Sequence, residues 1–444
     1  MNGTTLDASQ PILLSDSKTV RAWCMYDWAI SVYNLVITTT FFPIYFAELN
    51  KSAYGEGNIP FLGRTFKSSS LYDYSLAFAY SVGVLLLPIL SSIADSRGSK
   101  KGFLQFFTYL GGLACITMFW FKGHQPSVGL GVSCFVFATL GYVGSTVFYN
   151  SYLPEIAAPE DRDRISARGY SMGYVGSVIL QLVGFGLVVF LDDGSLGSLY
   201  TFLLVGIWWI GFSQITFKAL PKRMGTIASP GLSVFSAGFV ELRKVWAQVK
   251  LMPKLKWFLT SFLFYSMGVQ TVMLAATLFG SQLLGLPTTK LIITIVLIQL
   301  VAIPGAILMS RLSARFGNIS VLMGVVGFWV IVCLGAYGVA LLKEGGTNVE
   351  FHFYGLAVAV GLVMGGIQSL SRSTYSKLMP VTKDTASFFS FYDVTEKIAI
   401  VIGIFSFGYI DERFGMKNSV LILIVFFVLG FLSLSIARRK PETK

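Results

Sequence analysis

Charged residues are scarce in this chain of 444 residues. Asp, Glu, Lys and Arg together make up 13% of it, whereas a soluble protein of this length needs about a quarter to solvate its surface. Hydrophobic residues contribute 54%, phenylalanine occurs 38 times and the mean hydropathy is +0.69. This composition excludes a soluble globular protein and indicates an integral membrane protein embedded in the lipid bilayer.

Histidine and cysteine are also rare, with two and four copies. The four cysteines are Cys24, Cys115, Cys134 and Cys333. They are far apart and lie inside apolar runs, so they predict neither a disulfide framework nor a metal site. The phosphate-binding pattern G-x-x-x-x-G-K-[ST] does not occur, which argues against a nucleotide-driven pump. No nucleophile–base motif appears either, so we expect neither an enzyme nor a cofactor.

Apolar stretches long enough to cross a bilayer as helices, about 20 residues each, recur along the whole chain. They are residues 22–47, 71–94, 102–121, 128–151, 165–190, 199–218, 256–284, 289–311, 318–342, 352–378, 386–410 and 418–437. They do not alternate polar and apolar residues as the strands of a membrane barrel do. Glycine-rich stretches such as 169–177 and 361–366 suit close helix packing in lipid. The sequence therefore predicts an all-α membrane protein with twelve transmembrane helices.

The longest connection between predicted spans, residues 219–255, divides the chain into six-helix halves, 1–218 and 256–444. Apolar residues recur within this connection at four- and three-residue spacing. They are Phe235, Phe239, Leu242, Trp246 and Val249. That pattern predicts an amphipathic helix, which either lies along the cytoplasmic membrane surface or packs on neighbouring loops as a connector.

An internal repeat supports the two halves. Tyr149 and Pro154, at the end of the fourth predicted span, match Tyr375 and Pro380 at the end of the tenth with one common offset. Related halves with a substrate site between them are the usual architecture for alternating access.

Basic residues are distributed unevenly between the two sides of the predicted spans. Most of the 34 Lys and Arg residues fall on the side that would hold both termini, and excess positive charge marks the cytoplasmic side. We therefore expect both termini in the cytoplasm and no binding of nucleic acid, despite the net charge of +12. No cleavable signal is evident in the first twenty residues, and we expect the cell (inner or plasma) membrane.

Several motifs resemble a known family. The segment "DSRGSKK" (95–101) resembles the loop signature of the major facilitator superfamily, D-x-x-G-x-[RK]-[RK], between the second and third spans. The stretches "MYDWAISVYNLVITTTFFPIYF", "FYNSYLPEIA", "SARGYSMGYVGS", "GGIQSLSRS" and "FFSFYDVTEKIA" are similar to its vacuole-effluxer-like branch, the relatives of a yeast autophagy-associated vacuolar amino-acid exporter. Ile30 stands where that branch has Asn, and Ser91 where the signature has Gly.

This resemblance implies a major facilitator fold and a secondary active or facilitated transporter. The implied activity is export of small polar solutes, with amino acids favoured, by alternating access. The alternative is a non-transporting membrane sensor or assembly factor on the same scaffold, which would need a large extramembrane domain that the sequence does not contain. We expect a monomer.

Charged and signature residues gather at cytoplasmic helix ends. They are Asp95, Arg97, Gly98, Lys100, Lys101, Arg162, Arg164 and Arg168. Charges at helix ends can form and break ion pairs as two halves move, so we expect these residues to form a cytoplasmic gate. We expect Asp95 to be hydrated beside Arg97 and to matter more for turnover than for folding.

Three charges, Asp393, Glu396 and Lys397, interrupt the eleventh apolar run. Asp393 and Lys397 are four residues apart, so they share one helical face and can pair. Lys397 lies about 16 Å along the span, where an unpaired charge costs at least about 2.5 kcal/mol. The pair either holds helices together or forms a substrate or coupling site, and protonation of Asp393 would then link transport to a proton gradient. Glu396 projects to another side of the helix.

Further candidate substrate or coupling residues lie on the first, fourth, seventh and tenth spans, which line the central cavity in the superfamily that the chain resembles. They are Tyr26, Asp27, Asn34, Tyr149, Asn150, Gln270, Gln368 and Arg372. Asp27 is a second candidate for protonation, or it pairs near the membrane surface with Arg21 or a loop base. The uncharged residues could instead hold helices together by hydrogen bonds.

Overall fold

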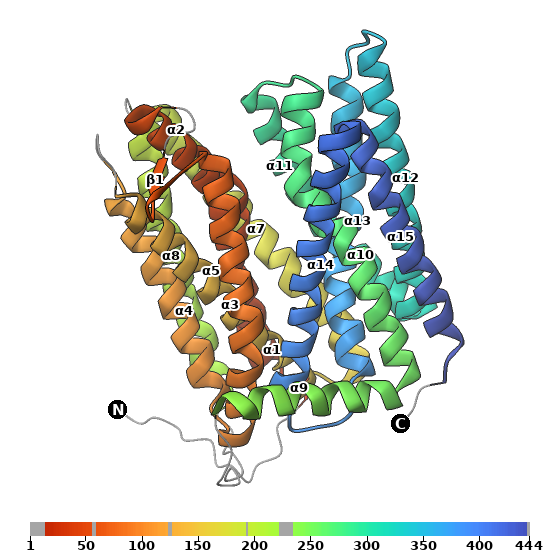
Figure 1. The fold of residues 1–444 in the computed structure, drawn as a ribbon. Coiled ribbons are helices and arrows are strands. Elements are labelled where there is room, and N and C mark those ends of the chain that lie inside the picture. Colours follow the sequence, from red (N-terminus) through yellow and green to blue (C-terminus); the bar gives the residue numbers. More distant parts are fainter. Residues whose placement is uncertain (1–13, 56–58, 123–126, 192–193, 222–233, 442–444) are drawn as a thin grey trace. The chain divides into compact units, whose positions relative to one another are not determined.

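Long helices form almost all of the protein (Figure 1). The computed structural model describes residues 14–55, 59–122, 127–191, 194–221 and 234–441. Among these residues, eleven helices are long and apolar enough to cross a membrane. A twelfth helix, α14 (Thr385–Phe414), has 30 residues and carries the charges Asp393, Glu396 and Lys397. The predicted all-α fold of twelve transmembrane helices is confirmed.

The helix boundaries agree with the predicted spans to within a few residues. In the first sequence half the elements are α1 (Ser17–Val32), η1 (Tyr33–Phe41), α2 (Phe42–Tyr54), β1 (Ile59–Phe61), β2 (Arg64–Phe66), α3 (Ser68–Arg97), α4 (Lys100–Thr117), η2 (Met118–Trp120), α5 (Val128–Asn150), α6 (Leu153–Ile156), η3 (Pro159–Asp161), α7 (Arg162–Phe190) and α8 (Gly194–Ala219). The remainder are α9 (Val234–Leu251), α10 (Pro253–Leu278), η4 (Phe279–Leu283), α11 (Thr288–Phe316), α12 (Asn318–Glu344), α13 (Glu350–Leu378), α14 and α15 (Met416–Arg439).

The chain forms two compact units. Unit 1 comprises Met1–Ile156, Val175–Glu241 and Lys383–Ser390, and unit 2 comprises Ala157–Tyr174, Leu242–Thr382 and Phe391–Lys444. The first turns of α7 therefore group with unit 2, and the first turns of α14 group with unit 1. The domain boundaries at 1–218, 219–255 and 256–444 remain a prediction, and these two helix starts are where the compact units depart from them.

The first span of unit 1 is not a uniform α-helix. Residues Tyr33–Phe41 form a π-helix of nine residues, a wide turn that is often found at functional sites. The hydroxyl groups of Thr39 and Thr40 donate to the Leu35 carbonyl at 2.8 and 3.1 Å, which supplies hydrogen bonds that the altered helix geometry leaves open. Gln181 Nε2 of α7 donates to Thr40 Oγ1 at 3.0 Å. The apolar pattern of residues 22–47 predicts a continuous helix and gives no sign of the π-helix.

A short hairpin follows the first span. Strands β1 and β2 pair antiparallel with Ile59 opposite Phe66, and Leu62 and Gly63 make the turn with φ values of 48° and 76°. Two successive residues with positive φ are typical of a tight two-residue hairpin. This hairpin lies between the predicted spans 22–47 and 71–94, and its turn is not predicted from the sequence, because leucine rarely occupies a left-handed turn position.

The helices of unit 2 approach one another closely through glycine. Figure 1 shows α10, α12, α13 and α15 running side by side, and α11 packs on α13. A side-chain carbon at Gly361 would lie 2.6 Å from the carbonyl oxygen of Ile298, and one at Gly365 would overlap the carbonyl of Ala302. The predicted close packing of 361–366 is thereby confirmed.

Substituting Gly365 by alanine is expected to destabilise the protein by about 1–3 kcal/mol, because α11 and α13 must move apart to accept a methyl group. Gly408→Ala is the matched control, since no atom lies within 4 Å of the added carbon there. That variant should be neutral or stabilising by up to about 1 kcal/mol. Thermal unfolding of the detergent-purified proteins measures both effects, and equal midpoints for the two variants would contradict the packing argument.

The predicted amphipathic helix exists as α9. Val245 and Val249 are buried, and Trp246 stacks on Phe391 of α14 with ring centroids 5.9 Å apart. The exposed residues of α9 include Arg243, Lys244 and Lys250. The side chains of Phe235, Phe239 and Leu242 lie outside the described part. Val245 and Val249 pack on protein, whereas Trp246 is 40% exposed, so a connector and a helix along the membrane surface both remain predictions.

Candidate functional site

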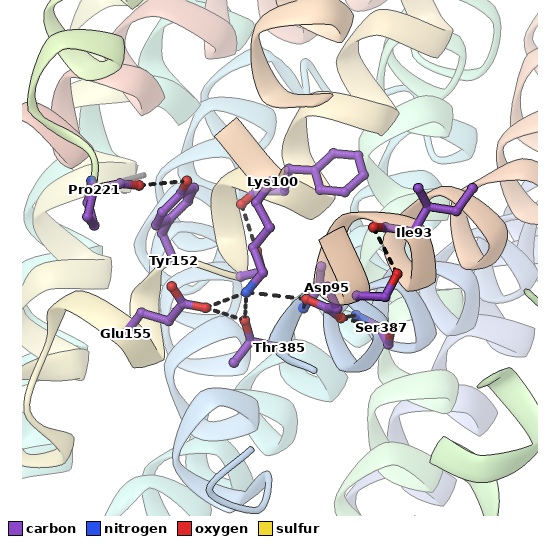
Figure 2. A network of polar contacts seen from close by, with 12 residues as sticks. Ile93, Asp95, Lys100, Tyr152, Glu155, Pro221, Thr385 and Ser387 are labelled. Atoms are coloured by element: carbon purple, nitrogen blue, oxygen red, sulfur yellow. Dashed lines mark hydrogen bonds and ion pairs between the residues drawn. The ribbon is translucent and has the colours of Figure 1, made fainter. Parts of the chain in front are cut away.

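A buried ion-pair network connects three helices of unit 1 (Figure 2). Lys100, the first residue of α4, pairs with Glu155 of α6 and lies 3.3 Å from Asp95 Oδ1 at the end of α3. Its ammonium group also donates to Thr385 Oγ1, whose hydroxyl donates to Glu155 Oε1 at 2.7 Å. The three charged side chains are between 3% and 8% exposed. Charges buried this deeply persist only when they are paired.

Asp95 also caps the start of α14. Its carboxylate accepts hydrogen bonds from the backbone N–H groups of Ala386 and Ser387, at 3.2 and 2.8 Å, and from the Ser387 hydroxyl at 2.8 Å. The first N–H groups of a helix have no partner within the helix and carry its positive dipole end. Asp95 therefore supplies from α3 the anionic cap that the start of α14 requires.

This geometry corrects the expectation that Asp95 is hydrated beside Arg97. Asp95 is buried and pairs with Lys100, whereas Arg97 is exposed. Gly98 ends α3 with φ 64°, which explains why glycine stands there. Lys101 donates to the Leu220 carbonyl at 2.9 Å instead of joining the network.

Glu155 lies within the stretch "FYNSYLPEIA" but is not among the site residues predicted from the sequence. A carboxylate in an otherwise apolar stretch is the signal that could have found it. Its partner Lys100 is more than fifty positions earlier in the chain, so no local spacing rule connects them.

A second network holds the start of α7 in unit 2. Asp163 accepts from Lys377 Nζ of α13 at 2.6 Å, from Asn318 Nδ2 of α12 at 2.6 Å and from Ser313 Oγ of α11 at 2.9 Å. Its neighbour Arg162 donates to the Ser376 carbonyl at 2.6 Å. At α7 the carboxylate, Asp163, lies at the helix start and its donors come from neighbouring helices. At α14 the donors lie at the helix start and the carboxylate, Asp95, comes from α3.

Of the other predicted gate residues, Arg164 and Arg168 are exposed. Arg164 pairs with Asp161, three residues earlier in the chain, at 2.7 Å. The structure therefore brings Asp95, Lys100 and, separately, Arg162 into polar networks, while the two exposed arginines lie apart from them.

Arg372 is the largest buried cation of unit 2. It is 2% exposed, its Nε and Nη2 donate to Ser166 Oγ and O at 2.9 and 3.0 Å, and its guanidinium lies 4.2 Å from the ring centre of Tyr170. Next to it, Tyr375 stacks on Tyr392 with ring centroids 4.8 Å apart. A planar guanidinium flanked by hydroxyl groups and aromatic rings suits the recognition of a carboxylate.

The charges of α14 form a third cluster, also in unit 2. Lys397 Nζ lies 3.3 Å from Asp393 Oδ1 and 3.1 Å from Glu396 Oε2, so the predicted pairing along one helical face is confirmed. Gln270 Nε2 of α10 donates to Glu396 Oε1 at 2.9 Å. Asp393 and Lys397 are each 5% exposed.

Asp27 lies in an aromatic cluster of unit 1. The Tyr149 hydroxyl donates to Asp27 Oδ2 at 2.8 Å, and Trp23 and Tyr26 pack on the Tyr149 ring with centroids 4.5 and 4.8 Å away. Tyr26 also shares a hydrogen bond of 2.6 Å with Thr108. Asp27 is thus buried and bonded to α5. Its role in transport remains a prediction.

The remaining candidates differ in burial. Asn150 is buried at the end of α5, whereas Asn34 in the π-helix and Gln368 on α13 are half-buried. Ile30 is 4% exposed and packs as an ordinary core residue, and the Ser91 hydroxyl donates to the Pro88 carbonyl at 3.1 Å. The two departures from the family motifs are therefore accommodated inside the helix bundle.

Residues 15–162 and 158–440 match the family described as vacuole effluxer Atg22 like. The chain belongs to this family. Among its relatives, the Bacillus subtilis (strain 168) protein named as the uncharacterized MFS-type transporter YxiO is 29% identical over 96% of both chains. Autophagy-related protein 22 of Saccharomyces cerevisiae is 25% identical over 94% of this chain and 90% of its own length.

Solved structures support the fold. A bacterial homologue of the iron transporter ferroportin, in an outward-facing state, matches with a TM-score of 0.69 at 14% identity, over 96% of this chain and 99% of that one. The proton:xylose symporter XylE matches with a TM-score of 0.70 at 14% identity, over 96% of both chains. Together with the family match and the MFS-type relative, this fold identifies the chain as a multi-pass membrane transporter of the major facilitator superfamily.

Proposed function

We propose that this effluxer-family transporter exports small polar solutes, with amino acids as the favoured class, by alternating access across the cell membrane. The observation that carries the proposal is the buried ion-pair network at the start of α14, which joins Asp95, Lys100 and Glu155 to Thr385 and Ser387. Polar contacts of this kind can be replaced by water when a helix end moves, whereas an apolar seal would lose hydrophobic free energy.

In this mechanism the helix starts of α14 and α7 act as the cytoplasmic gate. The Asp95 cap holds α14, and the Asp163 contacts with Lys377 and Asn318 hold α7. Release of both sets of contacts would open the cytoplasmic entrance to the substrate. We also propose that both termini are cytoplasmic, which the distribution of basic residues supports, and that the protein acts as a monomer.

Arg372 provides the chemistry for an amino-acid substrate. Its guanidinium fork, bonded to Ser166 and stacked over Tyr170, would exchange Ser166 for the substrate carboxylate. A bidentate guanidinium–carboxylate pair is stronger and more directional than a pair with lysine.

Transport in proteoliposomes tests this function. Labelled amino acids, dipeptides and sugars are assayed with and without a pH gradient, and we expect amino acids to give the largest signal. Arg372→Lys should raise KM for the best amino acid about 10–100-fold, because a charged hydrogen bond contributes about 1.5–3 kcal/mol, with a smaller effect on kcat. Transport of sugars alone, or an unchanged KM, would contradict the proposal.

Arg413→Lys is the matched control for this variant. Arg413 also lies over a tyrosine ring, 4.7 Å from the centre of Tyr409, but it is exposed. Its replacement should leave KM unchanged. Thermal unfolding of both variants separates a loss of substrate binding from a loss of folding.

A further inference from the structure

Two carboxylates share one lysine in α14. Lys397 lies 3.3 Å from Asp393 Oδ1 and 3.1 Å from Glu396 Oε2. If both carboxylates are ionised, this cluster carries one net negative charge inside the membrane span. A net charge at that depth is unfavourable, so the cluster gains by binding one cation.

The two carboxylates differ in what else they contact. Glu396 Oε1 accepts a hydrogen bond from Gln270 Nε2 at 2.9 Å, so this carboxylate has a donor besides Lys397. Asp393 Oδ2 is buried and has no hydrogen-bond partner among the described residues, although the side chain is only 6% exposed. A buried carboxylate oxygen without a donor favours protonation, because the neutral acid needs fewer hydrogen bonds.

The Lys100 network contains the same ratio of charges but gives one of its carboxylates additional hydrogen-bond donors. There too one lysine faces two carboxylates, Asp95 and Glu155. Asp95, however, accepts three hydrogen bonds from the start of α14, which stabilise its negative charge. Asp393 lies two turns inside α14, and its Oδ2 accepts no hydrogen bond from the described residues.

We propose that Asp393 is the proton-binding residue of this transporter and carries one proton per transport cycle on Oδ2. The proton comes from water and forms the O–H bond of the neutral acid, no other covalent bond changes, and the proton returns to water on the other side of the membrane. This inference rests on the proposed transport function and adds its coupling ion and the atom that binds it.

Protonation would alter the contacts of Lys397. With Asp393 neutral, the ammonium group pairs with Glu396, whose other oxygen is bonded to Gln270 of α10. The proton thus changes how strongly α14 is held to α10. Other titratable groups of this region are Tyr265 of α10, which interacts with Glu396 and Tyr392. Around Tyr392 of α14 lie Tyr375 and Arg372 of α13 and Tyr170 of α7.

Infrared difference spectroscopy of the detergent-purified protein tests proton binding without any substrate. Spectra at low and high pH are compared for the wild type, Asp393→Asn and Glu396→Gln. We expect the carbonyl band of a buried protonated carboxyl group in the wild type and in Glu396→Gln, and its loss in Asp393→Asn. Survival of the band in Asp393→Asn, or its loss only in Glu396→Gln, would overturn the assignment.

Proteoliposome transport tests the coupling. The probe is the labelled amino acid with the largest wild-type signal. With one proton exchanged per neutral solute, a pH difference of one unit corresponds to about 1.4 kcal/mol and to about tenfold accumulation. Asp393→Asn should still exchange labelled for unlabelled solute but should not accumulate it. Wild-type transport that ignores the pH gradient would refute the inference alone. A wild type that transports no member of the panel would refute the proposed function, and the infrared result would still decide where the proton binds.

Discussion

Lys100→Met is expected to be among the most damaging single substitutions in this protein, with a loss of about 3–5 kcal/mol in stability. Lys100 is the shared partner of Asp95 and Glu155, and all three side chains are nearly inaccessible to water. Its removal leaves two buried carboxylates without their cation. Thermal unfolding and the yield of detergent-extracted protein measure the effect.

Removing the carboxylate charges should rescue the folding of this variant. The triple substitution Asp95→Asn, Glu155→Gln and Lys100→Met leaves no uncompensated charge, and non-additive losses of this kind are expected for residues in direct contact. Arg97→Gln is the control, because Arg97 lies at the same helix end but is exposed; it should cost no more than about 0.5 kcal/mol. If Lys100→Met and Arg97→Gln prove equally mild, the network does not hold this end of the protein.

The rescued triple variant also separates folding from gating. A cysteine placed at Ser387, a residue bonded to Asp95, reports whether the start of α14 becomes accessible. If the network is the gate, modification of that cysteine by a membrane-impermeant thiol reagent should become faster in the triple variant. The four native cysteines are all buried and form no disulfide with one another, which limits background labelling.

The parts of the site that could be predicted from sequence are those set by local periodicity. The number of helices follows from the length of the apolar runs, and the Asp393–Lys397 pair follows from a four-residue spacing on one helical face. Gly98 and Gly317, which directly follow α3 and α11, both adopt positive φ, 64° and 81°. Each of these features depends on residues that are neighbours along the chain.

The parts that could not be predicted depend on contacts between distant segments. Asp95 was expected to pair with Arg97, two positions away, but tertiary structure brings it to Lys100 and to the start of α14. The Asp163 network likewise assembles residues of four helices. Trp23 and Tyr26 on α1 have the same three-residue spacing as Phe262 and Tyr265 on α10, and both pairs pack in aromatic clusters. The two pairs lie far apart in the chain, so no local pattern connects them.

The cluster in α14 predicts an asymmetric response to mutation. Lys397→Met removes the cation that pairs with both Asp393 and Glu396, so a loss of about 3–5 kcal/mol is expected. Asp393→Asn leaves Lys397 beside Glu396 and removes the oxygen that lacks a hydrogen bond, so it should change stability by no more than about 1 kcal/mol. Two partners that contact only each other would respond equally.

The double variant Asp393→Asn, Lys397→Met completes the cycle, and Glu396→Gln with Lys397→Met is its matched control. Each double variant retains one carboxylate, and each should be more stable than Lys397→Met alone because one uncompensated charge is gone. Thermal unfolding across the four members measures the coupling, and strictly additive losses would show that Asp393 and Lys397 do not interact.

Transport then separates the two roles that spacing alone leaves open. A pair that only holds helices together predicts a folded and active double variant, whereas a pair on the proton path predicts a folded variant without gradient-driven transport. We expect the second outcome, because Asp393 Oδ2 makes no hydrogen bond that would hold helices together among the described residues and can bind a proton.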